Sequence, residues 1–410
     1  MKADIDALMN ERGLDAIFIA GGEGYSEVRD YMTNGAPITG GYVVKKYGND
    51  PVLIVNGMET EEAKKSGYEV VSYGDIRVHE LIETYDDQNM RQVMVWQRCL
   101  QAADVDSGKI GMYGRGDINA YINWVQLANE TFDAYTFVGE TGRTLFDMAF
   151  LTKDDDELAR LQSVAERTNA VMALAWDFIA ACHADDDGAV LTSAGEPVTI
   201  GAIKTLVRME LLKRGLEDTG MIFAMGRDGG FPHSRGEADM VLRTGQAIVF
   251  DLFPREMGGG YHHDMTRTWS IDHATDDVQR AYDDVMTAFD MSIESFGLGK
   301  PTHKMQEVVL DYFESQGHPT GRSHPGAQEG YVHSLGHGIG LHIHERPRVS
   351  HTDQEDTWQV GNIVTIEPGL YYPERGFGIR VEDTFYVNDN GELISITPFR
   401  KDLVIPLASS

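Results

Sequence analysis

The chain has 410 residues, 42% of them hydrophobic, and 65 acidic residues against 35 basic ones give a formal net charge of −30. This charge disfavours nucleic acid as a partner, because phosphate attraction needs a basic patch. No apolar run reaches the roughly 18–20 residues that span a bilayer, so we expect no membrane partner.

The N-terminus bears on the cellular location, and the cysteines bear on the type of metal ligand. The first residues, MKADIDALMNERG, carry charges where a signal peptide needs an apolar block, so we expect a cytoplasmic protein. The two cysteines, Cys99 and Cys182, form no CxxC motif, so any metal would be held by oxygen and imidazole. Acidic residues are dispersed, as at 86–87 and 185–187, which favours a halophilic protein; an ordinary acidic cytosolic enzyme is the alternative.

Helical and strand patterns alternate over the first 150 residues. Ile5, Leu8 and Met9 recur at helical spacing, and Gly13 suits the end of that helix. Further elements are expected as strands at 16–19, 69–71 and 109–113, a helix at 59–65, and a hairpin of 41–44 with 52–55 around the turn formers 47–51. Such alternation predicts an α/β domain.

A second domain is expected from Lys153 onward. The run 154–157 is wholly acidic, which favours the start of a helix because negative charge stabilises the positive end of the helix dipole. This helix has one apolar face, formed by Leu158, Leu161, Ala165, Met172 and Trp176. From about residue 240 the pattern changes to β-hairpins. We therefore divide the chain into 1–152 and 153–410.

Two aspartates flank the first of these hairpins. An apolar strand ends at Asp251, and Asp264 follows the turn formers Pro254 and 258–260. A turn centred between residues 257 and 258 would set the aspartates directly opposite each other, with Cβ atoms about 4.5–5.5 Å apart. Carboxylates that close repel unless a cation lies between them. For this pair alone, two solvated turn aspartates are the alternative.

A second hairpin repeats the arrangement with glutamates. One strand runs into Glu367, and the returning strand carries Arg380 and Glu382 after the turn at 374–376. Glu367 and Glu382 would face each other across this hairpin, with Arg380 on the face of Glu382. A structural ion pair would explain Arg380 alone, but four carboxylates on two hairpins need a common explanation.

The segment 333–345 adds four histidines, with glycines that allow close approach: His333, His337, His342 and His344. Four carboxylates and one imidazole suit a pair of divalent cations such as Mn²⁺ or Co²⁺. Two ions about 3.5–4 Å apart can share a hydroxide and lower the pKa of its parent water. The sequence thus predicts a hydroxide nucleophile without any catalytic serine or cysteine.

These residues resemble the pita-bread metallopeptidases, which include methionine aminopeptidase, aminopeptidase P and prolidase. The segment 333–345 fits the proline-peptidase signature, and the resemblance extends over about 155–405. It implies an α+β protein, with an N-terminal α/β creatinase-like domain (1–152) and a C-terminal pita-bread catalytic domain (153–410). It also implies two divalent ions, Mn²⁺ first with Co²⁺, Zn²⁺ or Fe²⁺ as alternatives, bound by Asp251, Asp264, His337, Glu367 and Glu382.

The resemblance assigns catalytic roles to five side chains: His233, His333, His344, Glu367 and Arg380. His344 would stabilise the tetrahedral intermediate, His333 would be an additional active-site histidine, and His233 would contact the substrate near the scissile bond. Glu367 would also relay a proton, and Arg380 would brace the carboxylates. For His233 an ordinary loop histidine is the alternative.

One departure from the family concerns the first hairpin. Asp251 and Asp264 are 13 positions apart, two more than is usual in the family. One extra residue in each arm would keep the aspartates facing each other and alter the loop above the site. His262 and His263 lie on this extension, and we expect neither to bind metal.

The predicted activity is hydrolysis of a peptide bond whose nitrogen belongs to proline, in a small peptide substrate. The choice between Xaa-Pro dipeptidase and aminopeptidase P stays open, and the resemblance implies a homodimer. One competing class is a non-peptidase hydrolase or lyase of this fold, acting on an amidino or ectoine-like compound. A non-catalytic binding module is another. Some enzymes of the first class lack metal ligands and the binding modules have lost them, so the full set here argues against both.

Overall fold

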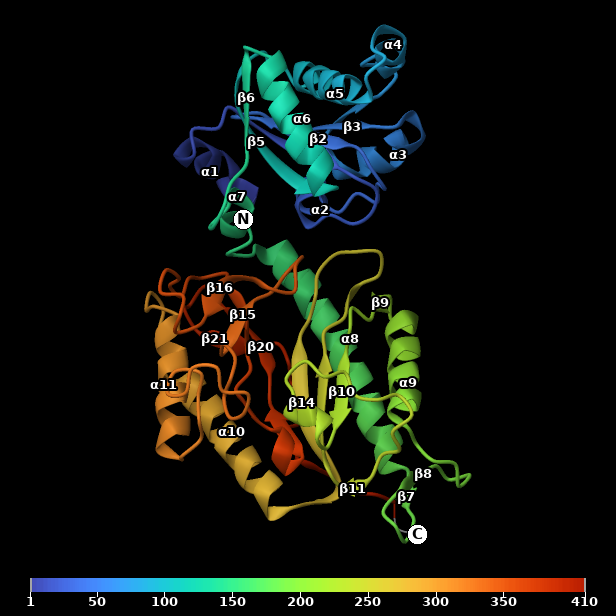
Figure 1. Ribbon diagram of the computed structural model, residues 1–410, viewed down its shortest axis with the longest axis vertical. Coiled ribbons are helices and arrows are strands. Elements are labelled where there is room, and N and C mark those ends of the chain that lie inside the picture. The colour runs from blue at the N-terminus through green and yellow to red at the C-terminus, as the bar shows by residue number, and fades with distance from the viewer. Residues whose placement is uncertain (1, 409–410) are drawn as a thin grey trace. The chain divides into compact units, whose positions relative to one another are not determined.

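The computed structural model describes residues 2–408 and divides into two compact units (Figure 1). The first comprises the chain up to Phe150 together with Gly258–Gly260, and the second comprises Leu151–Met257 and the chain from Tyr261 onward. Among the described residues, no helix is both long and apolar enough to cross a bilayer.

The first unit is built on one mixed sheet with strand order β4-β3-β2-β1-β5-β6. Its helices are α1 (Ile5–Glu11), α2 (Glu27–Met32), α3 (Thr60–Ala63), α4 (Val78–Thr84), α5 (Gln88–Ala102), α6 (Ile118–Thr131) and α7 (Leu145–Ala149). Its strands are β1 (Ala16–Gly21), β2 (Tyr42–Lys46), β3 (Val52–Val55), β4 (Glu69–Ser72), β5 (Gly108–Arg115) and β6 (Tyr135–Val138).

The central strand β1 explains why this unit has helices on both faces of its sheet. All of β1 except Gly21 is buried, and alternate residues of a strand point to opposite faces. Phe18 packs against Trp96 of α5, with ring centroids 5.7 Å apart. The hairpin predicted from the sequence is confirmed, since β2 pairs antiparallel with β3 in the register Tyr42↔Ile54.

The second unit carries β-sheets backed by two pairs of helices, α8 with α9 and α10 with α11 (Figure 1). The helices are α8 (Asp155–Ala180), α9 (Ile200–Lys213), α10 (Asp276–Glu294) and α11 (His303–Ser315). The strands are β7 (His183–Ala184), β8 (Val190–Leu191), β9 (Leu216–Glu217), β10 (Ile222–Met225), β11 (Thr244–Gly245), β12 (Ala247–Leu252), β13 (Arg255–Glu256), β14 (Met265–Ala274), β15 (Gly336–Gly338), β16 (Glu345–Val349), β17 (Ile363–Ile366), β18 (Gly369–Tyr372), β19 (Phe377–Arg380), β20 (Asp383–Val387), β21 (Leu393–Ser395) and β22 (Val404–Ile405).

Helix α8 begins at the acidic run that the sequence singled out. The Asp154 side chain accepts from the backbone N–H of Glu157, and the Glu157 side chain accepts from the backbone N–H of Asp154. This reciprocal capping box satisfies two backbone donors that a helix start otherwise leaves open. The apolar face of α8 packs on the sheet through Trp176, whose ring centroid lies 5.7 Å from that of Trp269.

The aspartate hairpin corrects one prediction. Asp251 pairs with Thr266, not with Asp264, and the same register continues to the bridge between Arg255 and His262. The turn is therefore centred one residue later than predicted. The reason is that Gly258, Gly259 and Gly260 all adopt positive φ, at 84°, 115° and 127°, and together form the tip. Asp251 and Asp264 are diagonal neighbours on one face, not a directly facing pair.

The glutamate hairpin consists of two ladders in one common register. β17 pairs with β20 through Ile366↔Asp383, and β18 pairs with β19 through Gly369↔Arg380. Continuing either ladder places Glu367 opposite Glu382. The turn falls where the sequence indicated, with Gly376 at φ 80° after the 3-10 turn Pro373–Arg375. The two ladders meet at the other end of this hairpin, at the level of Glu367 and Glu382.

Candidate active site

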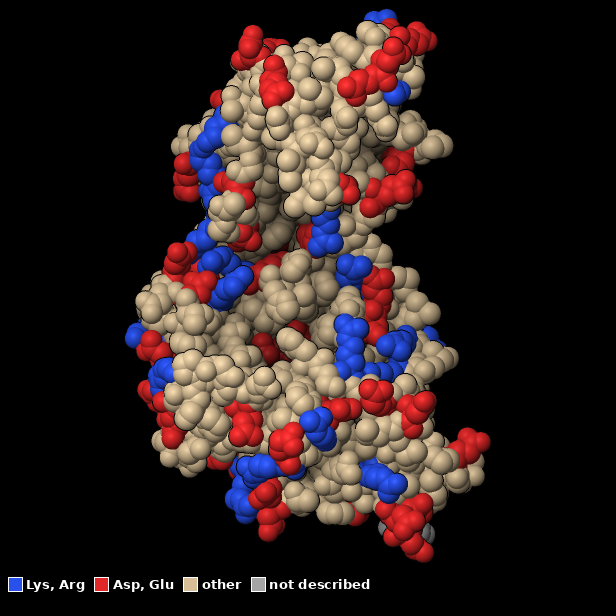
Figure 2. Space-filling view, viewed as in Figure 1, with Lys and Arg blue, Asp and Glu red and all other residues tan. Residues whose placement is uncertain are grey.

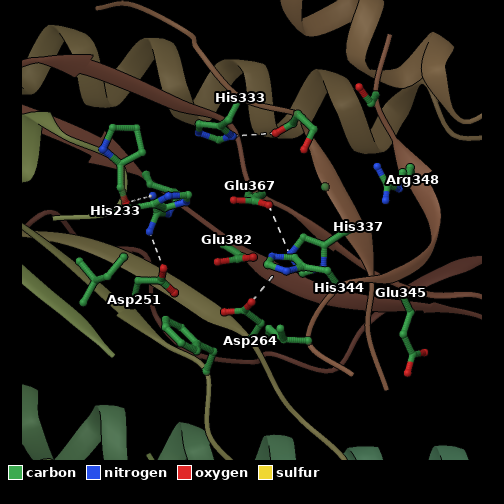
Figure 3. A pocket seen from close by; sticks show the side chains of 18 residues that line it. His233, Asp251, Asp264, His333, His337, His344, Glu345, Arg348, Glu367 and Glu382 are labelled. Carbon is green, nitrogen blue, oxygen red and sulfur yellow. Dashed lines mark hydrogen bonds and ion pairs between the residues drawn. The ribbon is translucent and has the colours of Figure 1, made fainter. Parts of the chain in front are cut away.

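A cavity of about 590 Å³ in the second unit collects the side chains singled out in the sequence. Figure 3 shows carboxylates from both hairpins converging on His337 of β15. The lining residues are Ile222, Pro232, His233, Asp251, Phe253, Asp264, His333, Ser334, Gly336, His337, Ile343, His344, Glu345, Arg348, Ser350, Glu367, Arg380 and Glu382. All five expected metal ligands and all expected catalytic residues thus lie around one space.

The distances within this cluster match those of atoms that share a cation. His337 Nε2 lies 3.8 Å from Asp264 Oδ2 and 3.6 Å from Glu367 Oε1 (Figure 3). Two ligands that each bind one cation at about 2.1 Å are separated by at most about 4.2 Å. Asp264, His337 and Glu382 also offer ligand atoms that lie within 4.8 Å of one another. Small side-chain adjustments would bring these three onto one ion.

The tautomer of His337 leaves a lone pair directed at the carboxylates. His337 Nδ1 lies 3.0 Å from the Gly338 carbonyl oxygen, which can only accept, so Nδ1 carries the proton. Burial lowers the pKa of His337 to about 3, so the ring is neutral. Its Nε2 is then a free acceptor, the state in which imidazole binds a metal.

Two of the buried carboxylates have an oxygen without a partner. Asp251 Oδ1 and Asp264 Oδ1 make no hydrogen bond to any residue that the structure describes. Burial, followed by the charges of Glu382 and Asp251, raises the pKa of Asp264 well above its ordinary value. Burial and then Asp251 raise the pKa of Glu382 to about 8. Repulsion of this kind is relieved by a cation between the oxygens.

Arg380 braces this cluster, although not through the glutamates. Its Nη2 lies 2.5 Å from Asp251 Oδ2, and its Nε donates to Thr266 Oγ1 at 3.1 Å. Thr266 Oγ1 in turn donates to Glu382 Oε2 at 2.7 Å. Thr266 stands opposite Asp251 in the aspartate hairpin, a register that the sequence analysis did not predict. Through this position Thr266 connects the aspartate hairpin to the glutamate hairpin.

A tyrosine that the sequence did not reveal connects Arg380 to His333. Arg380 Nη1 donates to the Tyr371 hydroxyl at 2.8 Å, and this hydroxyl lies 2.9 Å from His333 Nε2. His333 Nδ1 donates to the Ser334 carbonyl at 2.7 Å, so Nε2 must accept from Tyr371. Tyr371 follows Glu367 by four residues, and its position shortly after a predicted ligand is the one sequence signal that could have drawn attention to it.

The other predicted histidines divide into two groups. His233 and His344 are exposed in the cavity wall, and the His344 ring lies 4.4 Å from that of His337 between centroids. His262 and His263 are buried outside the cavity lining, and burial lowers the pKa of each to about 3. Arg348, which the sequence analysis overlooked, is exposed and lines the same cavity.

The lining of this cavity, on an α+β framework, fits a metal-dependent enzyme. Residues 159–389 match Metallopeptidase family M24, and the chain belongs to this family. The resemblance drawn from the sequence is thereby confirmed.

Full-length relatives agree with this membership. An Xaa-Pro dipeptidase from Pyrococcus furiosus is 25% identical over 402 residues, which cover 95% of this chain and 97% of that protein. The solved structure of an Xaa-Pro dipeptidase from Bacillus anthracis superposes with a TM-score of 0.74 at 24% identity, covering 99% of each chain. An X-Pro aminopeptidase from Thermotoga maritima gives a TM-score of 0.73 at 21% identity, also covering 99% of each chain. The predicted α+β pita-bread fold is confirmed.

Proposed function

We propose that the chain is an Xaa-Pro dipeptidase, a metallo-exopeptidase that hydrolyses the bond between an N-terminal residue and proline. In this proposal two divalent cations are held by Asp251, Asp264, His337, Glu367 and Glu382. The observation that carries the proposal is the convergence of these five side chains on one cavity, with buried oxygens of Asp251 and Asp264 left unpartnered among the described residues. A relative named Xaa-Pro dipeptidase that matches over 95% of the chain supports it.

The donor set fits hard or borderline divalent cations. Four carboxylates and one neutral imidazole suit Mn²⁺, Co²⁺, Zn²⁺ or Fe²⁺, and Mn²⁺ is the ion that we propose. When bound, such a pair supplies a water activated as a nucleophile at neutral pH and polarises the scissile carbonyl. The protein contributes the remaining groups.

The side chains of the cavity divide the work of orientation and proton transfer. His344, exposed beside His337, donates a hydrogen bond to the oxygen of the tetrahedral intermediate. Glu367 takes a proton from the attacking water and delivers it to the proline nitrogen as that bond breaks. His233 lines the cavity and contacts the substrate near the scissile bond. His333 has both ring nitrogens occupied, so it acts by positioning Tyr371 and Arg380.

Arg348 favours a dipeptidase over an aminopeptidase. Two guanidinium groups line the cavity, and Arg380 is buried and committed to Asp251, Thr266 and Tyr371. Arg348 is exposed there and can take the C-terminal carboxylate of an Xaa-Pro dipeptide. A longer peptide places no charge at that position, so the same group would not assist its binding.

The test compares Xaa-Pro, Xaa-Pro-Yaa and Xaa-Pro-amide substrates with Mn²⁺ supplied and bound metal measured by mass spectrometry. We expect two ions per chain and the highest kcat/KM on Xaa-Pro. Arg348→Gln should raise KM for Xaa-Pro by about 10- to 100-fold, the range for losing one charge-assisted hydrogen bond, and leave KM for the amide unchanged. Preference for Xaa-Pro-Yaa would assign an aminopeptidase. Turnover of an amidino or ectoine-like compound alone would replace the peptidase proposal.

We also propose a cytoplasmic homodimer adapted to high salt. Figure 2 shows acidic side chains spread over the visible face of the protein, with basic groups interspersed and no single acidic patch. A net charge of −30 makes self-repulsion large, and salt screens it. The unfolding temperature measured from 0.1 M to 3 M KCl tests the adaptation to salt, and sedimentation over the same range tests the dimer. A protein that is equally stable at all these concentrations would exclude the adaptation, and a monomer would exclude the dimer.

A further inference from the structure

A buried ion pair joins the start of the second unit to the segment that carries His344. Lys153 Nζ contacts Glu345 Oε2, and the two side chains are only 2% and 3% exposed. Taking both charges out of water costs several kcal/mol per ion, so such a pair contributes little net stability. Glu345 lines the cavity and directly follows His344 in the chain (Figure 3), which points to a different role for the pair.

Glu345 uses both carboxylate oxygens. Besides Oε2 on Lys153, its Oε1 accepts from the backbone N–H of His342 at 2.9 Å. His342 Nδ1 lies 3.1 Å from both the backbone nitrogen and the carbonyl oxygen of His344, so its tautomer decides which of the two it bonds to. The carboxylate thus fixes the turn 342–345, and the turn fixes where the His344 ring stands against His337.

Gly340 shows how closely the chain is fitted around this pair. A Cβ at position 340 would lie 2.5 Å from Glu345 Oε2 and 2.8 Å from Lys153 Cε. The Gly340 N–H donates to the His342 carbonyl at 3.1 Å. The Lys153 backbone is anchored as well, since its N–H donates to the Gly361 carbonyl at 2.8 Å. Both ends of the ion pair are therefore tied to fixed backbone.

We propose that Lys153 is a positioning residue for His344. Its ammonium group holds the Glu345 carboxylate in the orientation that accepts from the His342 N–H, and this orients the turn that presents His344 to the substrate. The inference rests on the role that the proposed function gives to His344. A displacement of about 1 Å can lower a rate by about 10²-fold, so the effect on kcat should be large although Lys153 touches no substrate.

The experiment uses Lys153→Met and the neutral pair Lys153→Met/Glu345→Gln, each alone and combined with His344→Ala. The neutral pair avoids an unpaired buried charge and should unfold near the wild-type temperature. Its glutamine can rotate away from His342, so kcat should fall by about 10- to 10²-fold with KM and bound metal nearly unchanged. Adding His344→Ala should then cause no loss beyond that of His344→Ala alone. Lys304 and Glu307 form an ion pair at 2.7 Å on the surface of α11, so Lys304→Met/Glu307→Gln is the matched control and should leave kcat unchanged.

The position of the His344 ring gives a readout that does not depend on turnover. It can be measured in the metal-free protein by crystallography, or by ¹⁵N-histidine spectra in which the His344 signal is assigned with the His344→Ala variant. We expect the ring to move in the neutral-pair variant and to stay in the surface control. Wild-type kcat in that variant, losses that multiply with His344→Ala, or unfolding of both Lys153 variants would each overturn the positioning role. Wild-type kcat in His344→Ala would instead overturn the proposed role of His344.

Discussion

Replacing Glu382 by glutamine should stabilise the metal-free protein at alkaline pH while abolishing metal binding. In the folded chain, burial and then Asp251 raise the pKa of Glu382 from 4.5 to about 8. Because the folded pKa is the higher one, the folded state keeps its proton where the unfolded chain has already released it. This contribution to stability is fully present below pH 4.5 and is lost as the pH rises to about 8.

The magnitude follows from the size of the shift. At about 1.4 kcal/mol per unit, a shift of this size corresponds to at most about 5 kcal/mol lost between pH 4.5 and 8. Glu382→Gln removes the ionisation, so the variant should resist urea better than wild type at pH 8 and about equally at pH 5. The measurement is urea unfolding of EDTA-treated proteins across this range.

The control is Glu374→Gln, at a side chain that is 79% exposed and should leave the pH dependence unchanged. Parallel stability curves for wild type and Glu382→Gln would refute the reasoning, because they would mean that Glu382 ionises in the folded state as readily as in the unfolded one. With Mn²⁺ added the order should reverse, since only wild type gains stability from binding.

Three further predictions concern single residues. Asp264→Ala should lose bound metal and activity but keep its circular dichroism spectrum; full turnover would exclude Asp264 as a ligand. His344→Ala should keep its metal and lose about 10²- to 10³-fold in kcat, the range for one oxyanion donor, and unchanged rates would remove it from the mechanism. Tyr371→Phe removes one hydrogen-bond partner from Arg380 and one from His333. The free energy of unfolding, measured with urea, should therefore fall by about 1–3 kcal/mol. An unchanged unfolding midpoint would contradict the hydrogen-bond chain.

The sequence was a good guide wherever a local pattern determines structure. The acidic run 154–157 indicated the start of α8 because capping and the helix dipole act within one turn. The turn formers between β2 and β3 gave the correct hairpin for the same reason. The five residues expected around a metal were found in one cavity because the segments carrying them match a known family.

The aspartate hairpin marks where local reasoning stopped being sufficient. Three glycines in a row allow several turns, and a shift of one residue at the tip changes every cross-strand pair by two. The sequence placed Asp264 opposite Asp251, whereas the structure places Thr266 there. That difference decides which side chain connects the two hairpins.

Contacts between residues far apart in the chain account for the rest. Arg380 meets Asp251 across 129 positions, and Lys153 meets Glu345 across 192. No spacing rule predicts such pairs, because they depend on how sheets and helices pack once they have formed. The sequence alone determined several of the elements, the chemical types of the ligands and the family. Only the tertiary structure decided the orientation of each ligand, because orientation is set by packing and hydrogen bonds that the folded chain alone brings together.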